Sequence, residues 1–186
     1  MTQTMKRNLI QMGYVTRDLE AALAYWTQVA GAGPFYCADY EPERQVYRGA
    51  PTHITFRVAY GYLGDMQVEL IQQLSGGASA YTEALEGAAT VPLGGLFHHI
   101  MLLHDGYDAA YEGFIAGGAE RCYDAFVEGV GRFCYLDARA QAGSFVELVE
   151  TTTDFEAACV TMREEHLRWD GSRPRRDFFR EILGLE

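Results

Sequence analysis

Two stretches decide the fold of this chain: MQVELIQ at Met66–Gln72 and SFVELVE at Ser144–Glu150. Both place the same Val-Glu-Leu core among residues that are typical of β-strands. Each stretch closes a longer series of elements, and the two series run in the same order. Because a repeated series of elements determines the architecture of a chain, the repeat is the starting point for predicting this fold.

The first series opens with LIQMGYVTR at Leu9–Arg17, an apolar run with β-branched and aromatic members that predicts a strand. Asp18 follows at a helix N-cap position, apolar residues recur at helical spacing, and Gly31 ends the helix. Three further strands are predicted at Phe35–Tyr40, Thr52–Tyr60 and Met66–Gln72. The first half of the chain therefore has the pattern strand, helix and three strands.

The second half repeats this order of elements. The strands are predicted at Leu96–Leu103, Glu120–Phe126, Gly131–Asp137 and Ser144–Glu150, with a helix at Tyr107–Ala116. We therefore expect one compact α+β domain with a βαβββ module at residues 8–74 and a second module at residues 96–153. Residues 75–95 are expected to form a linker with one short helix at Tyr81–Leu85, and residues 154–186 a C-terminal helical extension.

The composition is that of an ordinary globular protein, with 48% hydrophobic and 22% charged residues. A formal net charge of -11 argues against nucleic acid or an anionic membrane as a partner, because binding phosphates takes clustered Lys and Arg. No stretch reaches the roughly 20 apolar residues of a membrane-spanning helix, and MTQTMKRNLI at the N-terminus lacks the apolar core of a signal peptide. The four cysteines show no paired spacing. We expect a cytoplasmic protein.

Three parts of the chain resemble the vicinal-oxygen-chelate (VOC) superfamily of glyoxalase-like proteins. QMGYVTRDLEAALAYW, which begins at Gln11, is similar to the opening of the first module in that family, and GLFHHIMLL, which ends at Leu103, to the opening of the second. The VELI and VELV strands resemble its module ends. The resemblance covers residues 8–150 and implies two half-barrels that form a curved mixed sheet around a divalent metal ion.

In that superfamily the metal ligands come from the first and last strands of each module. Carried over by position, the resemblance implies Gln11, Glu69, His99 and Glu147 as ligands. Side chains alternate along a strand, so Glu69 and Glu147 each share a face with apolar neighbours, and burying two carboxylates there is unfavourable without a compensating charge. The donor set suits Zn²⁺, Ni²⁺, Co²⁺, Mn²⁺ or Fe²⁺. Alternation also predicts that His98 points away from His99.

The resemblance implies a metal-dependent lyase or isomerase. In that family the metal chelates two neighbouring oxygens of the substrate and stabilises an enolate, while a carboxylate removes a proton next to the carbonyl. Glu147 is the first candidate for this base and Glu69 the second. The ligand set is similar to that of glyoxalase I. However, Val15 stands where that enzyme carries an arginine for glutathione, which argues against glutathione adducts as substrates.

Two other functions stay open at this point. The glutamates would face solvent if their strands were half-exposed, and a chain without the metal would act only as a small-molecule-binding protein. An Fe(II) extradiol dioxygenase needs two histidines and one carboxylate, and Gln11 takes the place of one of those histidines. The dioxygenase is therefore the less favoured alternative.

Aromatic side chains predict the character of the pocket. The segment Phe35–Tyr62 is rich in tyrosine and phenylalanine, and every other one of them is expected to line the pocket together with Tyr123 and Phe133. Such a lining suits a small apolar or aromatic oxygenated substrate.

The C-terminal extension carries an apolar face made of Trp169, Phe178, Phe179 and Ile182. This face predicts packing either over the domain's own pocket or against a second subunit. Because proteins of this superfamily commonly dimerise, we expect a homodimer.

Overall fold

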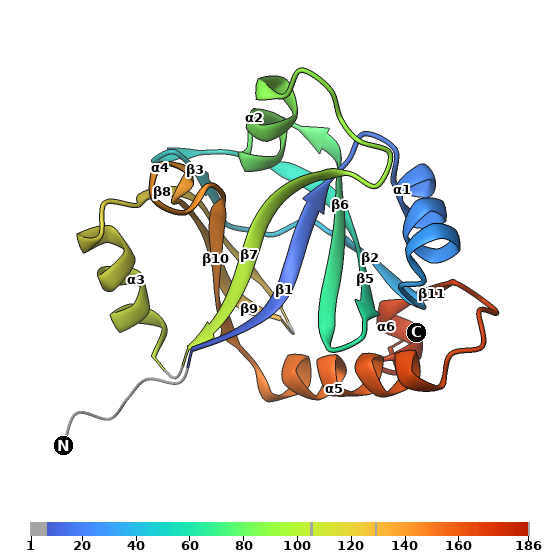
Figure 1. The fold of residues 1–186 in the computed structure, drawn as a ribbon. Helices are drawn as coiled ribbons and strands as arrows, with labels where there is room; N and C mark the ends of the chain where they lie inside the picture. The colour runs from blue at the N-terminus through green and yellow to red at the C-terminus, as the bar shows by residue number, and fades with distance from the viewer. Residues whose placement is uncertain (1–6, 105, 129, 186) are drawn as a thin grey trace.

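The computed structural model describes residues 7–104, 106–128 and 130–185, and it has the α+β architecture that the sequence predicts (Figure 1). The strands are β1 (Arg7–Val15), β2 (Phe35–Tyr40), β3 (Gln45–Tyr47), β4 (Ala50–Pro51), β5 (Ile54–Leu63), β6 (Met66–Gly76), β7 (Leu96–His104), β8 (Glu120–Val127), β9 (Gly131–Asp137), β10 (Phe145–Thr151) and β11 (Arg175–Asp177). The helices are α1 (Leu19–Tyr25), the π-helix η1 (Trp26–Ala30), α2 (Ala80–Gly87), α3 (Tyr107–Ala116), α4 (Arg139–Ala142), α5 (Thr153–Arg168) and α6 (Phe178–Glu181). Residues 1–6, which belong to the stretch considered as a signal peptide, lie outside the described residues.

All described strands belong to one mixed sheet, in which the two modules have matching strand orders: β2-β5-β6-β1 in the first and β8-β9-β10-β7 in the second. The first strand of each module runs parallel to its last, β1 beside β6 and β7 beside β10. β1 and β7 pair with each other antiparallel, with Gly13 opposite His99. The four strands that carry the predicted ligands are therefore neighbours at the centre of the sheet, in the order β6, β1, β7 and β10.

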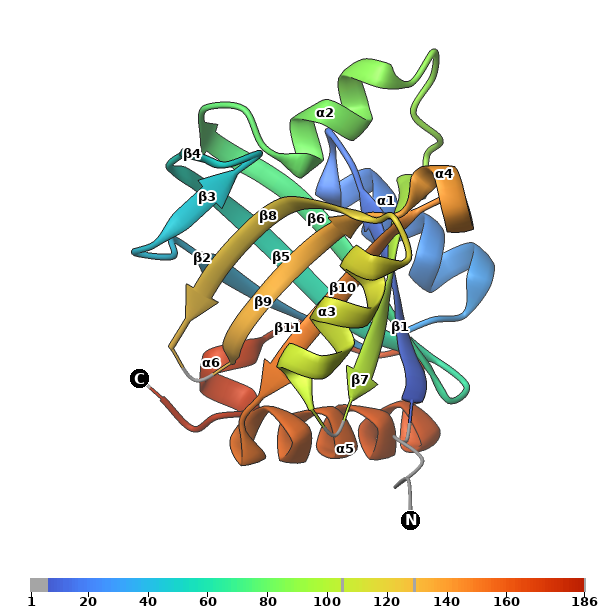
Figure 2. The same ribbon diagram turned by 90° about the vertical axis from the view of Figure 1, so that its left-hand side faces the viewer.

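The central strands of the sheet bury side chains on both faces. On the outer face, Val68 and Leu70 pack under α1, while Val146 and Leu148 pack under α3. The glutamates between these residues therefore point to the inner face, as the predicted alternation requires. Figure 2 shows the sheet curving around this inner face, with β8 and β9 in front of β5 and β6.

Short strands cover both ends of the sheet. β3 and β4 come from the first module, yet β3 pairs with β8 of the second. At the other end β11 pairs in parallel with β2. The prediction of a wholly helical C-terminal extension was therefore wrong for this strand. These strands cover edges that would otherwise expose unpaired backbone groups.

The C-terminal extension packs on its own domain. α5 lies along one end of the curved sheet (Figure 1), and Phe155 and Phe178 are buried in the same apolar cluster as the inner-face residues. His166 ties α5 to the first module, because its Nδ1 lies 2.6 Å from the Gly33 carbonyl oxygen and its Nε2 accepts a hydrogen bond of 3.0 Å from the backbone N–H of Gly64. Of the predicted apolar face, Phe178, Phe179 and Ile182 pack on the apolar cluster of the domain itself, and none of them lines the cavity over the predicted ligands. The homodimer stays a prediction.

Replacing Phe178 by alanine is expected to destabilise the domain by about 3–5 kcal/mol. The Phe178 ring is 1% exposed and lies 5.4 Å from the Tyr60 ring between centroids, so the substitution leaves a cavity beside the inner face. Leu167→Ala in the same extension is the control, because Leu167 is 62% exposed, and it should change stability by less than about 0.5 kcal/mol. Urea unfolding measures both variants. Equally small effects would mean that the extension does not stabilise the fold.

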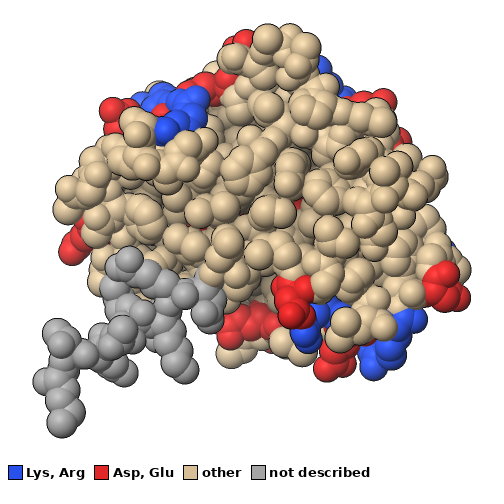
Figure 3. Space-filling view, in the orientation of Figure 1, with Lys and Arg blue, Asp and Glu red and all other residues tan. Residues whose placement is uncertain are grey.

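The face of the molecule in Figure 3 carries its charged side chains mostly at its margins. Some apolar side chains are exposed on strands β1 and β7, among them Leu9 at 47% and Phe97 at 43%. Within the described ranges, no helix combines the length and the apolar character that crossing a membrane requires.

Candidate metal centre

The structure brings the four predicted ligands together. Gln11 on β1, Glu69 on β6, His99 on β7 and Glu147 on β10 are all at most 6% exposed. The Nε2 atom of His99 lies 3.2 Å from Glu69 Oε2, 3.0 Å from Glu147 Oε2 and 3.3 Å from Gln11 Oε1. Four donor atoms from four adjacent strands thus gather around one point on the inner face.

Two of these donor atoms have unmet bonding capacity. Oε2 of Glu69 and Oε2 of Glu147 are buried and make no well-aligned hydrogen bond with any described residue, and both lie against the same nitrogen, His99 Nε2. That nitrogen offers at most one N–H, and leaving buried carboxylate oxygens only partly satisfied is unfavourable. A cation with bonds of about 2.1 Å would space adjacent ligand atoms roughly 3.0–3.4 Å apart, which matches the separations from His99 Nε2. The donor set therefore fits a divalent metal ion.

The charges of the site shift its proton affinities. Burial raises the pKa of Glu69, the nearby Glu147 carboxylate adds to the effect, and the neighbouring His99 only partly opposes it. Burial alone would lower the pKa of His99, but the carboxylates of Glu147 and Glu69 outweigh it and raise that pKa above its usual value. In the metal-free protein both groups therefore hold their protons to higher pH than they would in water.

Metal binding is expected to release protons and to weaken as the pH falls. A metal ligand must be deprotonated, and the raised pKa values, about 7 for Glu69 and about 9 for His99, mean that near neutral pH a metal ion must displace the proton of His99 and the proton that Glu69 carries about half of the time. Lowering the pH fills these proton sites further, so affinity falls. Calorimetric titration with Zn²⁺ in buffers of different ionisation enthalpy counts the released protons. Zn²⁺ binding that releases no protons, with an affinity that does not change with pH, would contradict the assignment of Glu69 and His99 as ligands.

Gly13 makes room for the imidazole ring of His99. A Cβ atom on Gly13 would lie 1.9 Å from Cε1 of that ring and 2.4 Å from each of its nitrogens. The ring therefore lies directly on the backbone of the adjacent strand. This close approach gives a physical reason for a glycine two residues after Gln11, in a motif that the sequence presented only as a resemblance.

The amide of Gln11 is oriented by a chain of hydrogen bonds. Its Nε2 donates to Gln67 Oε1 at 2.6 Å, which leaves Gln11 Oε1 facing His99. Gln67 in turn donates to the Tyr62 hydroxyl at 3.3 Å and to Cys159 Sγ at 3.6 Å. Cys159 lies on α5, so the C-terminal extension supports the orientation of a predicted ligand.

Alternation along the strand predicted that His98 points away from His99, and this prediction was wrong. The pairing of β1 with β7 shifts by one residue between Gly13 and Tyr14, and this β-bulge leaves His98 as the extra residue. Both imidazoles are buried, and their Nδ1 atoms lie 2.9 Å apart. Burial and the neighbouring His99 lower the pKa of His98 well below its usual value, so it stays neutral. Nothing in the sequence signals the bulge.

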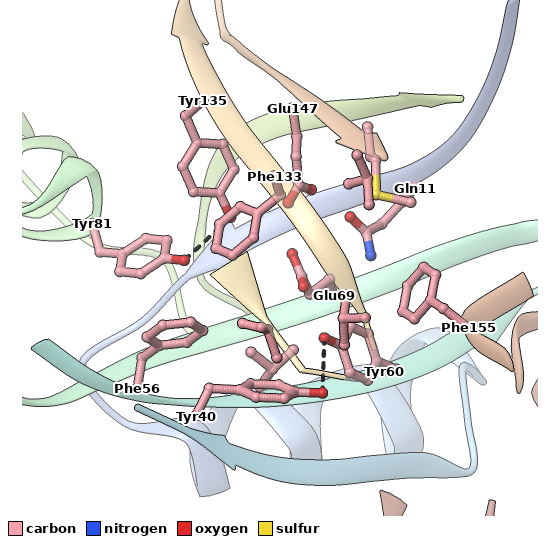
Figure 4. A pocket seen from close by; sticks show the side chains of 15 residues that line it. Gln11, Tyr40, Phe56, Tyr60, Glu69, Tyr81, Phe133, Tyr135, Glu147 and Phe155 are labelled. Atoms are coloured by element: carbon pink, nitrogen blue, oxygen red, sulfur yellow. Dashed lines mark hydrogen bonds between the residues drawn. The ribbon is translucent and has the colours of Figure 1, made fainter. Parts of the chain in front are cut away.

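Aromatic side chains line the narrow cavity over the two carboxylates (Figure 4). Tyr40, Phe56, Tyr60 and Phe133 were within the predicted set, whereas Tyr123 packs behind the lining and Tyr81, Tyr135 and Phe155 were not predicted. Two phenol pairs face each other, Tyr40 with Tyr60 at 3.5 Å and Tyr81 with Tyr135 at 3.2 Å. The free volume is about 30 Å³, room for about two water molecules.

A family model described as Glyoxalase/Bleomycin resistance protein/Dioxygenase superfamily matches residues 10–135. No curated protein sequence matches the chain. Among solved structures, a hypothetical protein from Bacillus halodurans has a TM-score of 0.55 at 14% identity, over 79% of this chain and 96% of that one. Methylmalonyl-CoA epimerase from Mycobacterium tuberculosis has a TM-score of 0.53 at 17% identity, over 80% of this chain and 91% of that one. A mutant of 4-hydroxymandelate synthase from Streptomyces coelicolor has a TM-score of 0.50 at 13% identity, over 77% of this chain and 38% of that one. At these identities the likeness shows the fold alone.

Proposed function

Because this chain belongs to the Glyoxalase/Bleomycin resistance protein/Dioxygenase superfamily, we propose that it is a metal-dependent lyase or isomerase that removes a proton next to a carbonyl. The observation that carries the proposal is a pair of buried carboxylates that share one imidazole, with Glu69 Oε2 and Glu147 Oε2 both within 3.2 Å of His99 Nε2. Gln11, Glu69, His99 and Glu147 would hold the ion. A divalent ion bound there would polarise a carbonyl substrate and lower the energy of the enolate that proton loss creates.

The base in this proposal is Glu147, with Glu69 as the alternative. Both carboxylates line the cavity and point toward each other in Figure 4. The proton passes from the substrate carbon to a carboxylate oxygen, and the bonding electrons move into the carbonyl group. Return of the proton to the other face gives an isomerase, and loss of a neighbouring leaving group gives a lyase. In this proposal the phenols of Tyr60 and Tyr135, which line the cavity, would orient substrate oxygens.

The side chains that line the cavity, rather than its volume of about 30 Å³, support a small apolar or aromatic substrate with oxygens on neighbouring carbons, and the aromatic side chains would have to move apart to admit it. None of the described lining residues is Lys or Arg, so a strongly anionic substrate would find no counter-ion among them. Arg48 and Arg57, two arginines of the first module, are paired instead with Glu83 and Asp39 on the surface. These pairings argue against glutathione adducts as substrates. The same conclusion follows from Val15, which stands where glyoxalase I carries an arginine for glutathione.

Two features weigh against the alternative functions. A dioxygenase site would need a second imidazole facing the ion, whereas Nδ1 of His98 faces His99 and its Nε2 faces a backbone carbonyl. In a metal-free binding protein the one imidazolium of His99 would face two buried carboxylates, so its single positive charge could not compensate both of them.

Hydrogen–deuterium exchange tests the proposed chemistry. The metal-loaded protein is incubated in D₂O with small aliphatic and aryl α-hydroxyketones, and loss of the proton next to the carbonyl is followed by NMR. We expect exchange in the wild type, a loss of more than about 100-fold in Glu147→Gln, and no change in Glu150→Gln, a surface glutamate on the same strand. Equal exchange in wild type and Glu147→Gln would overturn the assignment of the base. Binding of these compounds without any exchange would favour a binding protein.

A further inference from the structure

His98 is held in one orientation beside the candidate metal centre. Its ring is 2% exposed and stacks on Phe145, with ring centroids 4.7 Å apart and planes at 28°. The edge of the Tyr135 ring closes the other side, at 5.1 Å and 90°. The position of each ring nitrogen is therefore set by packing. Nδ1 faces Nδ1 of His99 at 2.9 Å, and Nε2 faces the carbonyl oxygen of Ala80 at 3.3 Å.

These two contacts determine where the protons lie. A carbonyl oxygen only accepts hydrogen bonds, so Nε2 of His98 must carry the hydrogen. A neutral imidazole has one N–H, which leaves Nδ1 of His98 as an acceptor. Nδ1 of His99 must then be the donor in the contact between the two rings. Nδ1 of His99 therefore keeps its hydrogen when a metal ion displaces the proton from Nε2, and the lone pair is then on Nε2, the atom that faces both carboxylates.

The opposite arrangement has two faults. With the hydrogen on Nδ1 of His98, the bare Nε2 of that ring would face the Ala80 carbonyl, lone pair against lone pair. The single hydrogen of His99 would then lie on Nε2, where it would block the lone pair that a metal ion needs. The backbone carbonyl of α2 therefore selects between the two arrangements.

We propose that His98 is a positioning residue that fixes the proton of His99 on Nδ1 and so presents Nε2 to the metal ion, with the Ala80 carbonyl as the anchor of the relay. The proposal rests on the proposed metal site. Partners of this kind orient a ligand ring and raise its basicity, and their loss typically lowers metal affinity about 10- to 100-fold. His98 never touches the ion or the substrate in this account.

Substitutions at His98 test this role. Asparagine places an acceptor oxygen close to the position of Nδ1, whereas leucine has a similar shape and no acceptor. We expect His98→Leu to lose about 10- to 100-fold in Co²⁺ affinity, measured by competition with a chromophoric chelator, and His98→Asn to stay within a few-fold of wild type. His53→Leu is the control, because the side chain of His53 is exposed on the surface, 2.9 Å from Glu41, and the substitution should not change the affinity. A His98→Leu variant that binds Co²⁺ as tightly as wild type does would overturn the proposal.

A second measurement needs neither metal nor variant. In metal-free protein with ¹⁵N-labelled histidine, the proposal predicts a scalar coupling across the hydrogen bond between the two Nδ1 atoms, with the hydrogen on His99. A hydrogen on Nδ1 of His98 instead, or no coupling, would overturn the assignment even if the leucine variant failed to fold. A wild type that binds no divalent ion would defeat the proposed function, and this coupling would then decide the role of His98 by itself.

Discussion

Gly13→Ala is expected to abolish tight metal binding. The new Cβ would lie 1.9 Å from Cε1 of His99, far inside contact distance, so the ring must move. It has little room to do so, because His98 and Tyr135 pack against it with ring centroids at 5.2 Å and 4.9 Å. Displacing Nε2 breaks the ligand spacing, and we expect metal affinity to fall by more than about 100-fold. Overpacking should also lower the free energy of unfolding by about 1–3 kcal/mol.

Equilibrium dialysis against Co²⁺ and urea unfolding measure these two effects of Gly13→Ala. Gly113→Ala is the matched control, because a Cβ at Gly113 meets nothing within 4 Å and the residue lies inside α3. That control should keep its metal and gain up to about 1 kcal/mol from helix propensity. Gly13→Ala with wild-type affinity would mean that the position of the His99 ring does not matter for the metal.

Glu69→Gln is expected to have opposite effects on metal binding and on stability. The variant loses a charged ligand, so metal affinity should fall by more than about 100-fold. In metal-free protein, however, the substitution removes one of two buried carboxylates that share a single imidazole. We expect the metal-free variant to be more stable than metal-free wild type by about 1–3 kcal/mol, because burial raises the pKa of Glu69 and thereby destabilises its charged form.

The sign of this stability gain depends on pH. A carboxyl whose pKa is raised by folding destabilises the fold above that pKa and has no such effect where both states are protonated. The gain in Glu69→Gln should therefore be present at about pH 8 and vanish toward pH 4. Urea unfolding with a chelator at both values measures it, with Glu150→Gln as the surface control. A loss of stability in the metal-free variant at pH 8 would contradict a site built for a cation.

Much of this arrangement is visible in the sequence. The paired Val-Glu-Leu strands and the repeated order of elements predict the two modules, and alternation correctly turns Glu69 and Glu147 to the inner face while Val68 and Leu70 pack outward. The resemblance to known proteins then selects Gln11 and His99, which the sheet brings next to both carboxylates. Local periodicity determines the two modules and the direction of the two glutamates, whereas Gln11 and His99 are found only through the resemblance.

Other features depend on contacts between distant segments. Alternation failed at His98 because a β-bulge adds one residue to β7, and no residue pattern marks it. The pairing of β3 with β8 and the parallel addition of β11 to β2 join segments that the local pattern does not connect. The apolar face of the extension was also ambiguous, because packing on the domain itself and packing on a second chain require the same side chains.

The central claim is that Gln11, Glu69, His99 and Glu147 bind one divalent metal ion. The most direct test is metal analysis after equilibrium dialysis of wild type and Glu147→Ala against Zn²⁺, Ni²⁺, Co²⁺, Mn²⁺ and, under nitrogen, Fe²⁺. We expect wild type to retain one equivalent of at least one of these ions and the folded variant to retain none. A folded wild type that binds none of them, or a variant that retains the ion as well as wild type does, would contradict the claim.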